Sequence, residues 1–298
     1  MKLYKVKITP TSTFGTSLKG DTLFGQMCWA IRYTFGEKKL ESLLLDYANS
    51  PFLVVSDGFL SGYLPKPTMP MSLLGEDGEK KKENRKKIWL MLDELQRGDF
   101  AKARTDKELN NKKTTKAIVK NSLNHQTFRT DDSGAFAPYA EEETFLYAQD
   151  IYFLIDESRF KVEELKQAFI MLSKMGYGKN SSIGKGFFEF GDFEEIKFKN
   201  GSKTFMTLSP SVLFEEKNIH KTYYEPFTRF GKHGAGLANS NPFKKPILMA
   251  DSGAVVIFKD SCKKDYIGKA INKHSSHSKT VHQGYSIVLP IIIKEFAV

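Results

Sequence analysis

The chain has 298 residues and a formal net charge of +10; 40% of its residues are hydrophobic and 27% are charged, as in a globular protein of about two domains with a core large enough to need no disulfides. Its two cysteines, Cys28 and Cys262, lie far apart without CxxC spacing. This excludes a disulfide framework and a cysteine-ligated zinc or iron–sulfur site.

We expect a reducing, cytoplasmic setting. The N-terminal segment alternates charged and apolar residues, which predicts a strand over residues 2–8 and not a signal peptide. No stretch reaches the roughly 18 apolar residues that a membrane-spanning helix needs. No membrane partner is therefore expected.

The positive charge is concentrated in two blocks. Residues 76–120 carry +5 and residues 220–298 carry +7, whereas residues 121–175 carry −5. A polyanion such as nucleic acid is the natural partner of the basic blocks, because each neutralised phosphate releases counterions. A solvated lysine-rich surface is the alternative, and charge alone does not choose between the two.

A first amphipathic helix follows the first strand. Asp21 is its predicted N-cap, and Gly36 stands where a C-terminal glycine is expected. Apolar residues recur at helical spacing between them, at Leu23, Met27, Ile31 and Phe35.

The middle of the chain predicts a long β-hairpin. A short helix with Ile88 and Leu95 ends at Gly98, and residues 112–125 then form one arm of the hairpin. The turn is expected near residues 131–134, and residues 136–143 begin the returning arm. Residues 144–155 predict one strong strand.

A second helix and a glycine-rich loop follow. Apolar residues from Val162 to Met175 have helical spacing and end at Gly176, and residues 187–190 predict a strand after the loop. The order is βαββαβ with a long insertion, which is the ferredoxin-like or RRM plan. We therefore predict an α+β protein with an N-terminal domain over residues 1–199, an insertion over about 40–140, and a second domain over 200–298 with strands near 203–208, 255–259 and 284–294.

The glycine-rich loop is the most informative motif. It is not a Walker A loop, because five residues separate Gly178 from Gly184 and because it runs from helix to strand. The same direction excludes a dinucleotide fingerprint, and the match to an RRM signature at residues 185–187 breaks off after Phe187. Bare backbone amides with lysines and serines predict phosphate contact; the alternative is a plain turn. The predicted RNA-binding residues here are Gly178, Lys179, Asn180, Ser181, Ser182, Gly184, Lys185 and Gly186.

Histidines provide no recognisable active site. His274 and His277 have metal-like spacing but no nearby carboxylate, so we interpret them as part of a solvated loop. His125 or His233 could serve acid–base cleavage of RNA, yet neither has a recognisable partner. We expect no catalysis, no metal and no cofactor.

Residues 220–233 interleave aromatic and basic side chains. Tyr223, Tyr224 and Phe227 could stack on bases while cations meet phosphates. Any single ring could instead belong to the core. The predicted RNA-binding residues of this segment are Tyr223, Arg229, Lys232 and His233.

These motifs together resemble the RAMP superfamily of CRISPR proteins. The resemblance rests on the KGDTLFG opening of the first helix (residues 19–25), the LPKP segment (residues 64–67), the long hairpin and the glycine loop, and extends to residues 283–285 and the final strand. Within the superfamily, the chain is similar to the fourth subunit of the type III-A Csm effector complex, which caps the 5′ end of the CRISPR RNA.

The resemblance implies two ferredoxin-like domains that hold the 5′ handle of the CRISPR RNA. It also implies a β-hairpin thumb at about residues 112–140, which wedges near the boundary between handle and guide and so lies near the target RNA. Further predicted RNA-binding residues are Lys19 and Gly20 before the first helix and Asn121, His125, Phe128 and Arg129 on the thumb.

The implied protein partners are the large polymerase-like subunit and the backbone RAMP subunit. The acidic residues 141–164 are one candidate docking face, or else a solvated one. The predicted function is thus a non-catalytic RNA-binding subunit in antiviral defence. The alternatives are a metal-independent endoribonuclease that processes CRISPR precursor RNA, and a scaffold that binds only protein.

Overall fold

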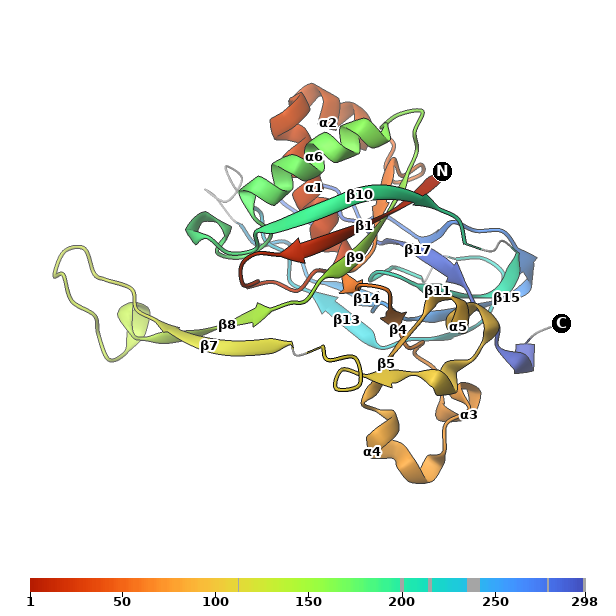
Figure 1. Cartoon of the computed structure of the whole chain (residues 1–298). Coiled ribbons are helices and arrows are strands. Elements are labelled where there is room, and N and C mark those ends of the chain that lie inside the picture. The colour runs from red at the N-terminus through yellow and green to blue at the C-terminus, as the bar shows by residue number, and fades with distance from the viewer. Residues whose placement is uncertain (112, 199–200, 214–215, 235–241, 278, 297–298) are drawn as a thin grey trace.

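The computed structural model describes residues 1–111, 113–198, 201–213, 216–234, 242–277 and 279–296. Within these ranges, two antiparallel five-stranded sheets form the centre of the molecule, helices cover the first sheet, and a long hairpin extends from the body (Figure 1). The predicted α+β class is confirmed as a mixed fold with antiparallel sheets. The predicted boundary at residues 199–200 falls outside the described residues, as does Lys112 at the start of the predicted hairpin arm.

The first sheet follows the predicted strand–helix order. Its strands run in the order β10, β1, β9 and β2, with β3 also paired to β9. Helix α1 connects β1 to β2, helix α6 connects β9 to β10, and the two helices pack together with α2 above the sheet (Figure 1). The bounds are β1 Lys2–Pro10, α1 Gly20–Phe35, α2 Glu37–Leu44, β2 Leu53–Val55, β3 Phe59–Leu60, β9 Gln149–Ile155, α6 Val162–Met175 and β10 Phe188–Ile196.

Helix α1 buries the predicted apolar stripe, but it begins differently from the prediction. Leu23, Met27 and Ile31 are all fully buried. The N-cap is Lys19, whose side chain makes no capping hydrogen bond. The Asp57 carboxylate, in a loop distant in sequence, accepts a hydrogen bond from the Gly20 amide at 2.7 Å. It thus satisfies one of the free backbone amides at the start of the helix. The prediction of Asp21 as N-cap is wrong: it lies in the first turn.

The second sheet has the order β12, β15, β11, β17 and β16. No α-helix is described in residues 201–296, so side chains of the first sheet cover one face of this sheet instead. A two-stranded ribbon, β13 with β14, lies beside it. The bounds are β11 Ser202–Thr207, β12 Ile219–Tyr223, β13 Pro226–Arg229, β14 Ile247–Ala250, β15 Val255–Cys262, β16 Tyr266–Gly268, β17 Tyr285–Pro290 and the 3₁₀ turn η6 Lys294–Phe296.

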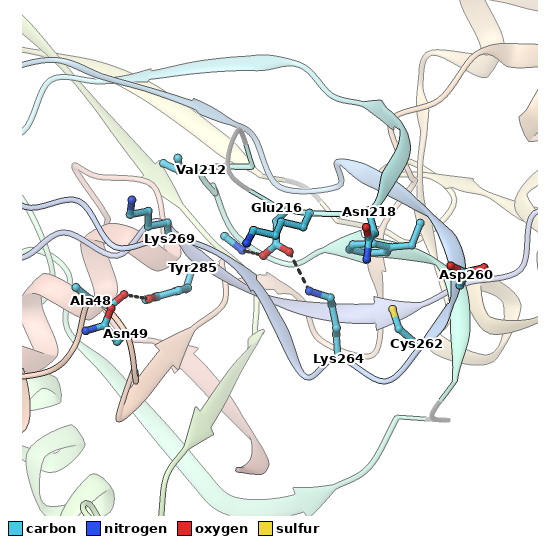
Figure 2. A pocket seen from close by; sticks show the side chains of 13 residues that line it. Ala48, Asn49, Val212, Glu216, Asn218, Asp260, Cys262, Lys264, Lys269 and Tyr285 are labelled. Carbon is cyan, nitrogen blue, oxygen red and sulfur yellow. Dashed lines mark hydrogen bonds and ion pairs between the residues drawn. The ribbon is translucent and has the colours of Figure 1, made fainter.

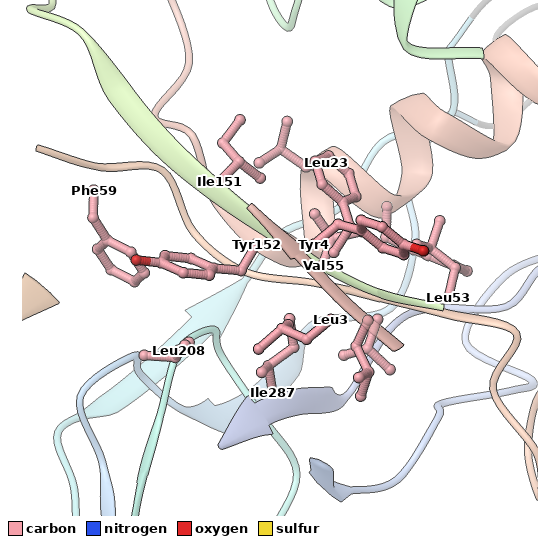
Figure 3. Close-up of a cluster of buried hydrophobic side chains, with 14 of the residues drawn as sticks. Leu3, Tyr4, Leu23, Leu53, Val55, Phe59, Ile151, Tyr152, Leu208 and Ile287 are labelled. Atoms are coloured by element: carbon pink, nitrogen blue, oxygen red, sulfur yellow. The ribbon is translucent and has the colours of Figure 1, made fainter. Parts of the chain in front are cut away.

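One hydrophobic core joins the two sheets. Ile287 of the second half lies below Leu3 of the first strand, and Leu208 belongs to the same buried cluster (Figure 3). The Gln283 side chain adds a polar link: its Nε2 donates to the Val55 carbonyl and its Oε1 accepts from the Val55 amide, both at 2.8 Å. The fully buried Gln283 therefore completes the edge of β2 as a neighbouring strand would.

A small subdomain fills the insertion before the hairpin. Its three-stranded sheet has the order β4, β5 and β6. Ile88 lies in β5 rather than in the predicted helix, which begins only at Leu92 and ends at the expected Gly98. The bounds are β4 Leu64–Pro65, α3 Met71–Leu74, η1 Gly78–Lys80, α4 Lys81–Asn84, β5 Lys87–Leu90, α5 Leu92–Arg97, η2 Phe100–Lys102 and β6 Arg104–Thr105.

The long hairpin is formed by β7 (Thr114–Lys120) and β8 (Tyr139–Phe145), paired in register from Thr114 opposite Phe145 to Lys120 opposite Tyr139. Beyond the strands an apical loop with the 3₁₀ turn η3 (Gly134–Phe136) projects from the body (Figure 1). The prediction of one strand over residues 144–155 is wrong. Strand β8 pairs with β7 in the hairpin, β9 pairs with β1 in the first sheet, and residues 146–148 between them belong to no strand.

Candidate nucleic-acid interface

The glycine loop is a tight connection between α6 and β10. Gly176, Gly178, Gly184 and Gly186 all have positive φ, between 72° and 91°. A Cβ on Gly186 would lie 2.0 Å from the Tyr177 carbonyl oxygen. Glycine is therefore required there by both conformation and space.

The loop packs against the segment between β1 and α1. The Gly186 amide donates to the Thr13 carbonyl, the Lys179 amide to Thr16 Oγ1, and the Tyr177 hydroxyl to the Ser17 carbonyl, at 2.7–2.9 Å. The turn at residues 182–184 remains exposed. The backbone available to a phosphate is therefore the tip of the loop and not its base, where Gly186 is buried.

Glutamates of the hairpin neutralise both lysines of the loop. Lys179 Nζ lies 2.5 Å from Glu141, and Lys185 Nζ lies 2.6 Å from Glu143. Glu141 also accepts from Lys120 and Asn180, each at 2.7 Å. The sequence predicted the lysines as phosphate ligands but missed these acids, although the EEE run of the returning arm was a signal for them.

The two ion pairs differ in burial. The Lys179 side chain is 56% exposed, so it can turn away from Glu141 at little cost, whereas Lys185 contacts a Glu143 side chain that is only 1% exposed. Hydrogen bonds from Lys120, Lys179 and Asn180 lower the pKa of Glu141 to about 2. The hydrogen bond from Lys185 likewise lowers the pKa of Glu143.

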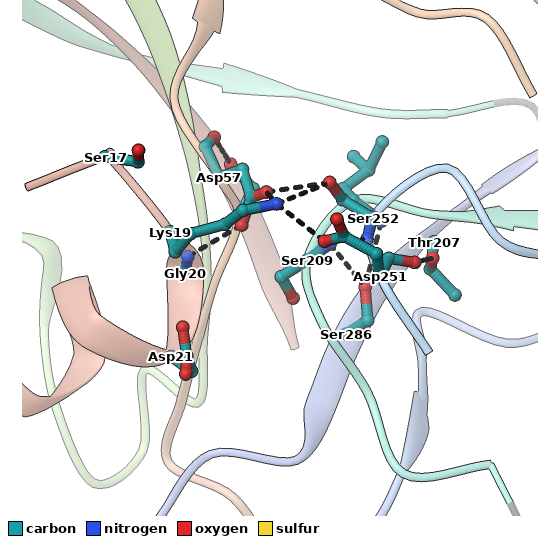
Figure 4. Close-up of polar contacts among 12 residues, drawn as sticks. Ser17, Lys19, Gly20, Asp21, Asp57, Thr207, Ser209, Asp251, Ser252 and Ser286 are labelled. Carbon is teal, nitrogen blue, oxygen red and sulfur yellow. Dashed lines mark hydrogen bonds and ion pairs between the residues drawn. The ribbon is translucent and has the colours of Figure 1, made fainter. Parts of the chain in front are cut away.

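Lys19 and Gly20 lie in an internal polar network (Figure 4). Lys19 Nζ is 2.9 Å from Asp57 and 2.6 Å from Asp251, and Ser252 Oγ donates to Asp57 at 2.7 Å. Burial opposes the charged form of Lys19, but the two aspartates outweigh it and raise its pKa. The network joins the start of α1 to the loop after β14. Lys19 is therefore bound to two aspartates of this chain, which the sequence did not predict.

Arg229 is also directed inward. Its guanidinium makes a bidentate pair with the buried Asp21, at 2.6 and 2.7 Å. Burial would raise the pKa of Asp21, but hydrogen bonds from His282 and Arg229 lower it to about 2. Arg229 therefore fastens the β13–β14 ribbon to α1, and its role in phosphate binding stays a prediction.

The other residues predicted in this segment differ in exposure. Tyr223 is half-buried against the core, with Lys221 Nζ 5.0 Å from the centre of its ring. Lys232 is exposed and lies over the Phe243 ring. His233 is buried and contacts Ser275 Oγ at 2.5 Å.

The four predicted thumb residues lie in the apical region of the hairpin, and all are exposed. A small turn orders part of it: the Phe128 amide donates to the Asn124 carbonyl at 2.7 Å, and Asn124 pairs with Arg129. Phe128 has a φ of +53° and its side chain is 80% exposed. Asn121 directly follows Lys120, which shares Glu141 with Lys179 and Asn180, so the glycine loop contacts the hairpin strands next to their apical end. His125, Phe128 and Arg129 lie further along the apical region.

A pocket in the described residues lies elsewhere. It has a volume of about 690 Å³ and is lined by parts of β15, β16 and the loop before β12, with Glu216 paired to Lys264 at 2.9 Å (Figure 2). None of the predicted RNA-binding residues lines it. Nor do the predicted residues form one open surface, because Gly20, Gly186 and His233 are buried.

The described histidines form no metal centre. His274 is 4% exposed, so the interpretation of a solvated loop is wrong for it; its ring lies 5.6 Å from that of His282. Among the described residues, no group of three or more potential ligands could hold a metal ion. In the same residues, no helix is long and apolar enough to cross a membrane.

No protein-family model matches the sequence, and no curated protein does. Solved structures do match. A chain of the Csm1–Csm4 cassette in complex with pppApA has a TM-score of 0.62 at 18% identity, over 99% of this chain and 100% of that one. A chain of the same cassette with cA4 has a TM-score of 0.61 at 17% identity, over 98% of each chain.

A third match comes from a different assembly. A chain of the Csm3–Csm4 subcomplex of the type III-A CRISPR-Cas interference complex has a TM-score of 0.59 at 17% identity, over 97% of this chain and 99% of that one. Csm4 is the subunit that both assemblies have in common. The chain therefore has a fold like that of Csm4, as the resemblance in its sequence predicted.

Proposed function

We propose that this chain is a non-catalytic RNA-binding subunit of a type III-A CRISPR effector complex and that it holds the 5′ handle of the CRISPR RNA. The observation that carries the proposal is the likeness in fold to Csm4 chains over almost the whole length. The exposed glycine loop beside a projecting hairpin supports it independently.

The topology fits two ferredoxin-like units. In the first sheet the order β10, β1, β9, β2 is the 4-1-3-2 order of a βαββαβ unit, with α1 and α6 as its two crossovers. The second sheet is a degenerate unit, because no α-helix is described in it. The RNA would follow the side of the molecule where the glycine loop and the hairpin meet.

The loop would bind phosphate through its exposed tip. The amides of residues 182–184 and the Lys179 ammonium, once it turns from Glu141, are the groups that a phosphate can reach. Lys185 instead holds the hairpin through the buried Glu143. We assign Lys179 to RNA contact and Lys185 to positioning.

The hairpin would serve as the thumb. Its apex carries the exposed Phe128 ring and the Arg129 guanidinium, which suit stacking on a base and contact with a phosphate. It would interrupt base stacking at the edge of the handle, close to the target RNA. His125 is exposed at the apex and His233 is bound to Ser275 on another element, an arrangement that supports binding rather than acid–base cleavage.

Within a complex, the chain would dock on a large polymerase-like subunit and a backbone RAMP subunit, the places that Csm1 and Csm3 take in the matched assemblies. Of the predicted acidic face, Glu141, Glu143, Glu157 and Glu164 are paired with lysines of this chain. Glu142 and Glu163 are exposed and have no lysine partner among the described residues, so they are the acids we assign to docking.

The test is to purify the chain with its co-expressed partner subunits and to sequence the RNA that co-purifies. A short transcript beginning with the repeat-derived handle is expected. Incubation of the purified protein with repeat RNA in a chelator tests the alternative. Specific cleavage that is lost in His125→Ala or His233→Ala would replace the proposal with the endoribonuclease, and purification without RNA would favour the protein-only scaffold.

A further inference from the structure

The β13–β14 ribbon has two faces of different character. Its register pairs Phe227 with Met249 and Thr228 with Leu248, so alternate residues point to opposite sides. On the inner face Met249 is fully buried and Arg229 is bound to Asp21. Phe227 lies between two cations, 5.2 Å from Lys19 Nζ and 4.8 Å from the Arg229 guanidinium.

The outer ribbon face is exposed and unusually rich in apolar side chains. The Phe230 side chain is 74% exposed, and Phe243 and Leu248 are 60% and 54% exposed. Lys232 lies over the Phe243 ring, with Nζ 4.9 Å from its centre. We define the outer ribbon face as Thr228, Phe230, Lys232, Phe243, Lys245 and Leu248.

Charge selects the kind of partner. Residues 226–233 and 242–249 contain four cationic residues, Arg229, Lys232, Lys244 and Lys245, and no Asp or Glu. Neither Lys232 nor Lys245 has a carboxylate partner among the described residues. Lysine is depleted at protein–protein interfaces, whereas exposed rings between cations are what single-stranded nucleic acid binds, with bases on the rings and phosphates at the cations.

The inner side of the ribbon is fastened to the start of α1, next to the segment that the glycine loop contacts. The segment before α1 contacts the loop through Thr16 and Ser17, and α1 contacts the ribbon through Asp21 and Arg229. One strand of RNA leaving the loop could therefore pass along this segment to the ribbon. Because contacts on its inner side hold the ribbon in place, the outer ribbon face should lose little conformational entropy when a base stacks on it.

We infer that the outer ribbon face is a second RNA-contact surface, on which a base of the single-stranded RNA stacks against Phe230 while Lys232 and Lys245 meet the flanking phosphates. The inference rests on the proposed function. It changes the predicted contacts: Phe227 and Arg229 stabilise the fold, and the rings that contact RNA are Phe230 and Phe243, which were not predicted from the sequence.

The test uses a fluorescein-labelled, ten-nucleotide single-stranded RNA and fluorescence anisotropy on the full chain. Phe230→Ala is expected to weaken binding about tenfold, the lower range for losing one base stack. The salt dependence should stay unchanged, because no charge is removed. Phe230→Trp should retain affinity and lose part of its added fluorescence when RNA binds. Leu45→Ala is the matched control, because Leu45 is 90% exposed at the end of α2, away from the ribbon (Figure 1).

Three outcomes separate the alternatives. If the wild-type chain binds RNA but Phe230→Ala stays within twofold and Phe230→Trp is not quenched, the ribbon inference fails while the proposed function stands. If Phe230→Ala binds RNA normally but no longer assembles with its partner subunits, the face docks protein and the inference is again overturned. If the wild-type chain binds no RNA, alone or in the complex, the proposed function itself fails.

Discussion

The glycine loop and the outer ribbon face each contain two lysines, but in the part of the chain that the structure describes the lysines of the loop are bound to carboxylates and those of the ribbon are not. In the loop, Lys179 and Lys185 are each paired with a glutamate of the hairpin. On the ribbon, Lys232 and Lys245 are exposed beside aromatic rings and have no acid partner among the described residues. The difference teaches that a lysine in a binding motif is available to a ligand only where the fold supplies no carboxylate for it.

The largest effect should separate the inner from the outer face of the ribbon. Arg229→Ala leaves the buried Asp21 carboxylate without its bidentate partner, which should destabilise the protein by about 3–5 kcal/mol in urea unfolding. Lys232→Ala removes an exposed cation and should change stability by less than about 0.5 kcal/mol. Adding Asp21→Asn to Arg229→Ala should recover part of the loss. Equal losses in the two single variants would contradict the distinction between the faces.

A second pair of variants tests which part of the glycine loop is structural. Gly186→Ala combines strain at positive φ with a Cβ in contact with the Tyr177 carbonyl, and should cost about 2–4 kcal/mol. Gly184→Ala introduces only the backbone strain of a positive φ, because no atom lies within 4 Å of its Cβ. It should lower the free energy of unfolding by about 1 kcal/mol. Thermal unfolding measures both. A loss at Gly184 as large as that at Gly186 would show that the exposed tip is as constrained as the base.

The salt dependence of RNA binding compares the cations directly. Lys179→Ala and Lys232→Ala should each lower the slope of log K against log salt by about one, because each removes one phosphate contact. Lys185→Ala should change the slope by less, since its ammonium holds Glu143. Anisotropy titrations over a range of salt concentrations provide the slopes. A full unit lost in Lys185→Ala would mean that RNA displaces the buried pair.

The smallest effect concerns acid. The pKa of Glu141 is lowered from 4.5 to about 2 by the hydrogen bonds of Lys120, Lys179 and Asn180, so the stability it contributes is present above about pH 4.5 and is lost as the pH falls towards 2. Wild type and Glu141→Gln should therefore differ slightly in melting temperature at pH 7 and converge in acid. If the two melting temperatures still differ at the lowest pH, the stabilisation does not come from the ionised Glu141 carboxylate. Because solvent screens the exposed Lys179 partner of Glu141, the difference should be small.

Local patterns predicted the elements that are set by local chemistry. The spacing from Val162 to Met175, closed by Gly176, predicted α6, and the dense glycines predicted the tight loop that follows. The hairpin was predictable from β-branched residues on one arm and from its returning arm. Asp21 was predicted wrongly as an N-cap. An aspartate near a helix start usually caps the helix, but here its carboxylate binds the distant Arg229.

The candidate site was predictable by segment but not by side chain. The aromatic–basic pattern indicated residues 220–233, but it could not say which rings face inward, because a shift of one residue along a strand exchanges its two faces. Phe227 and Arg229 therefore turned out to face α1, while Phe230 faces outward. The acids that neutralise Lys179 and Lys185 lie about 40 residues earlier in the chain, outside any local window.

The sequence by itself determined the strand–helix order of the first sheet, the glycine-dense turn after α6 and the excess of positive charge, because each depends on the properties of single residues or of neighbours along the chain. Only the tertiary structure decided which of those charges are paired inside the protein. Ion pairing depends on distances of a few ångströms between side chains such as Arg229 and Asp21, which are 208 positions apart and meet only when the ribbon packs on α1.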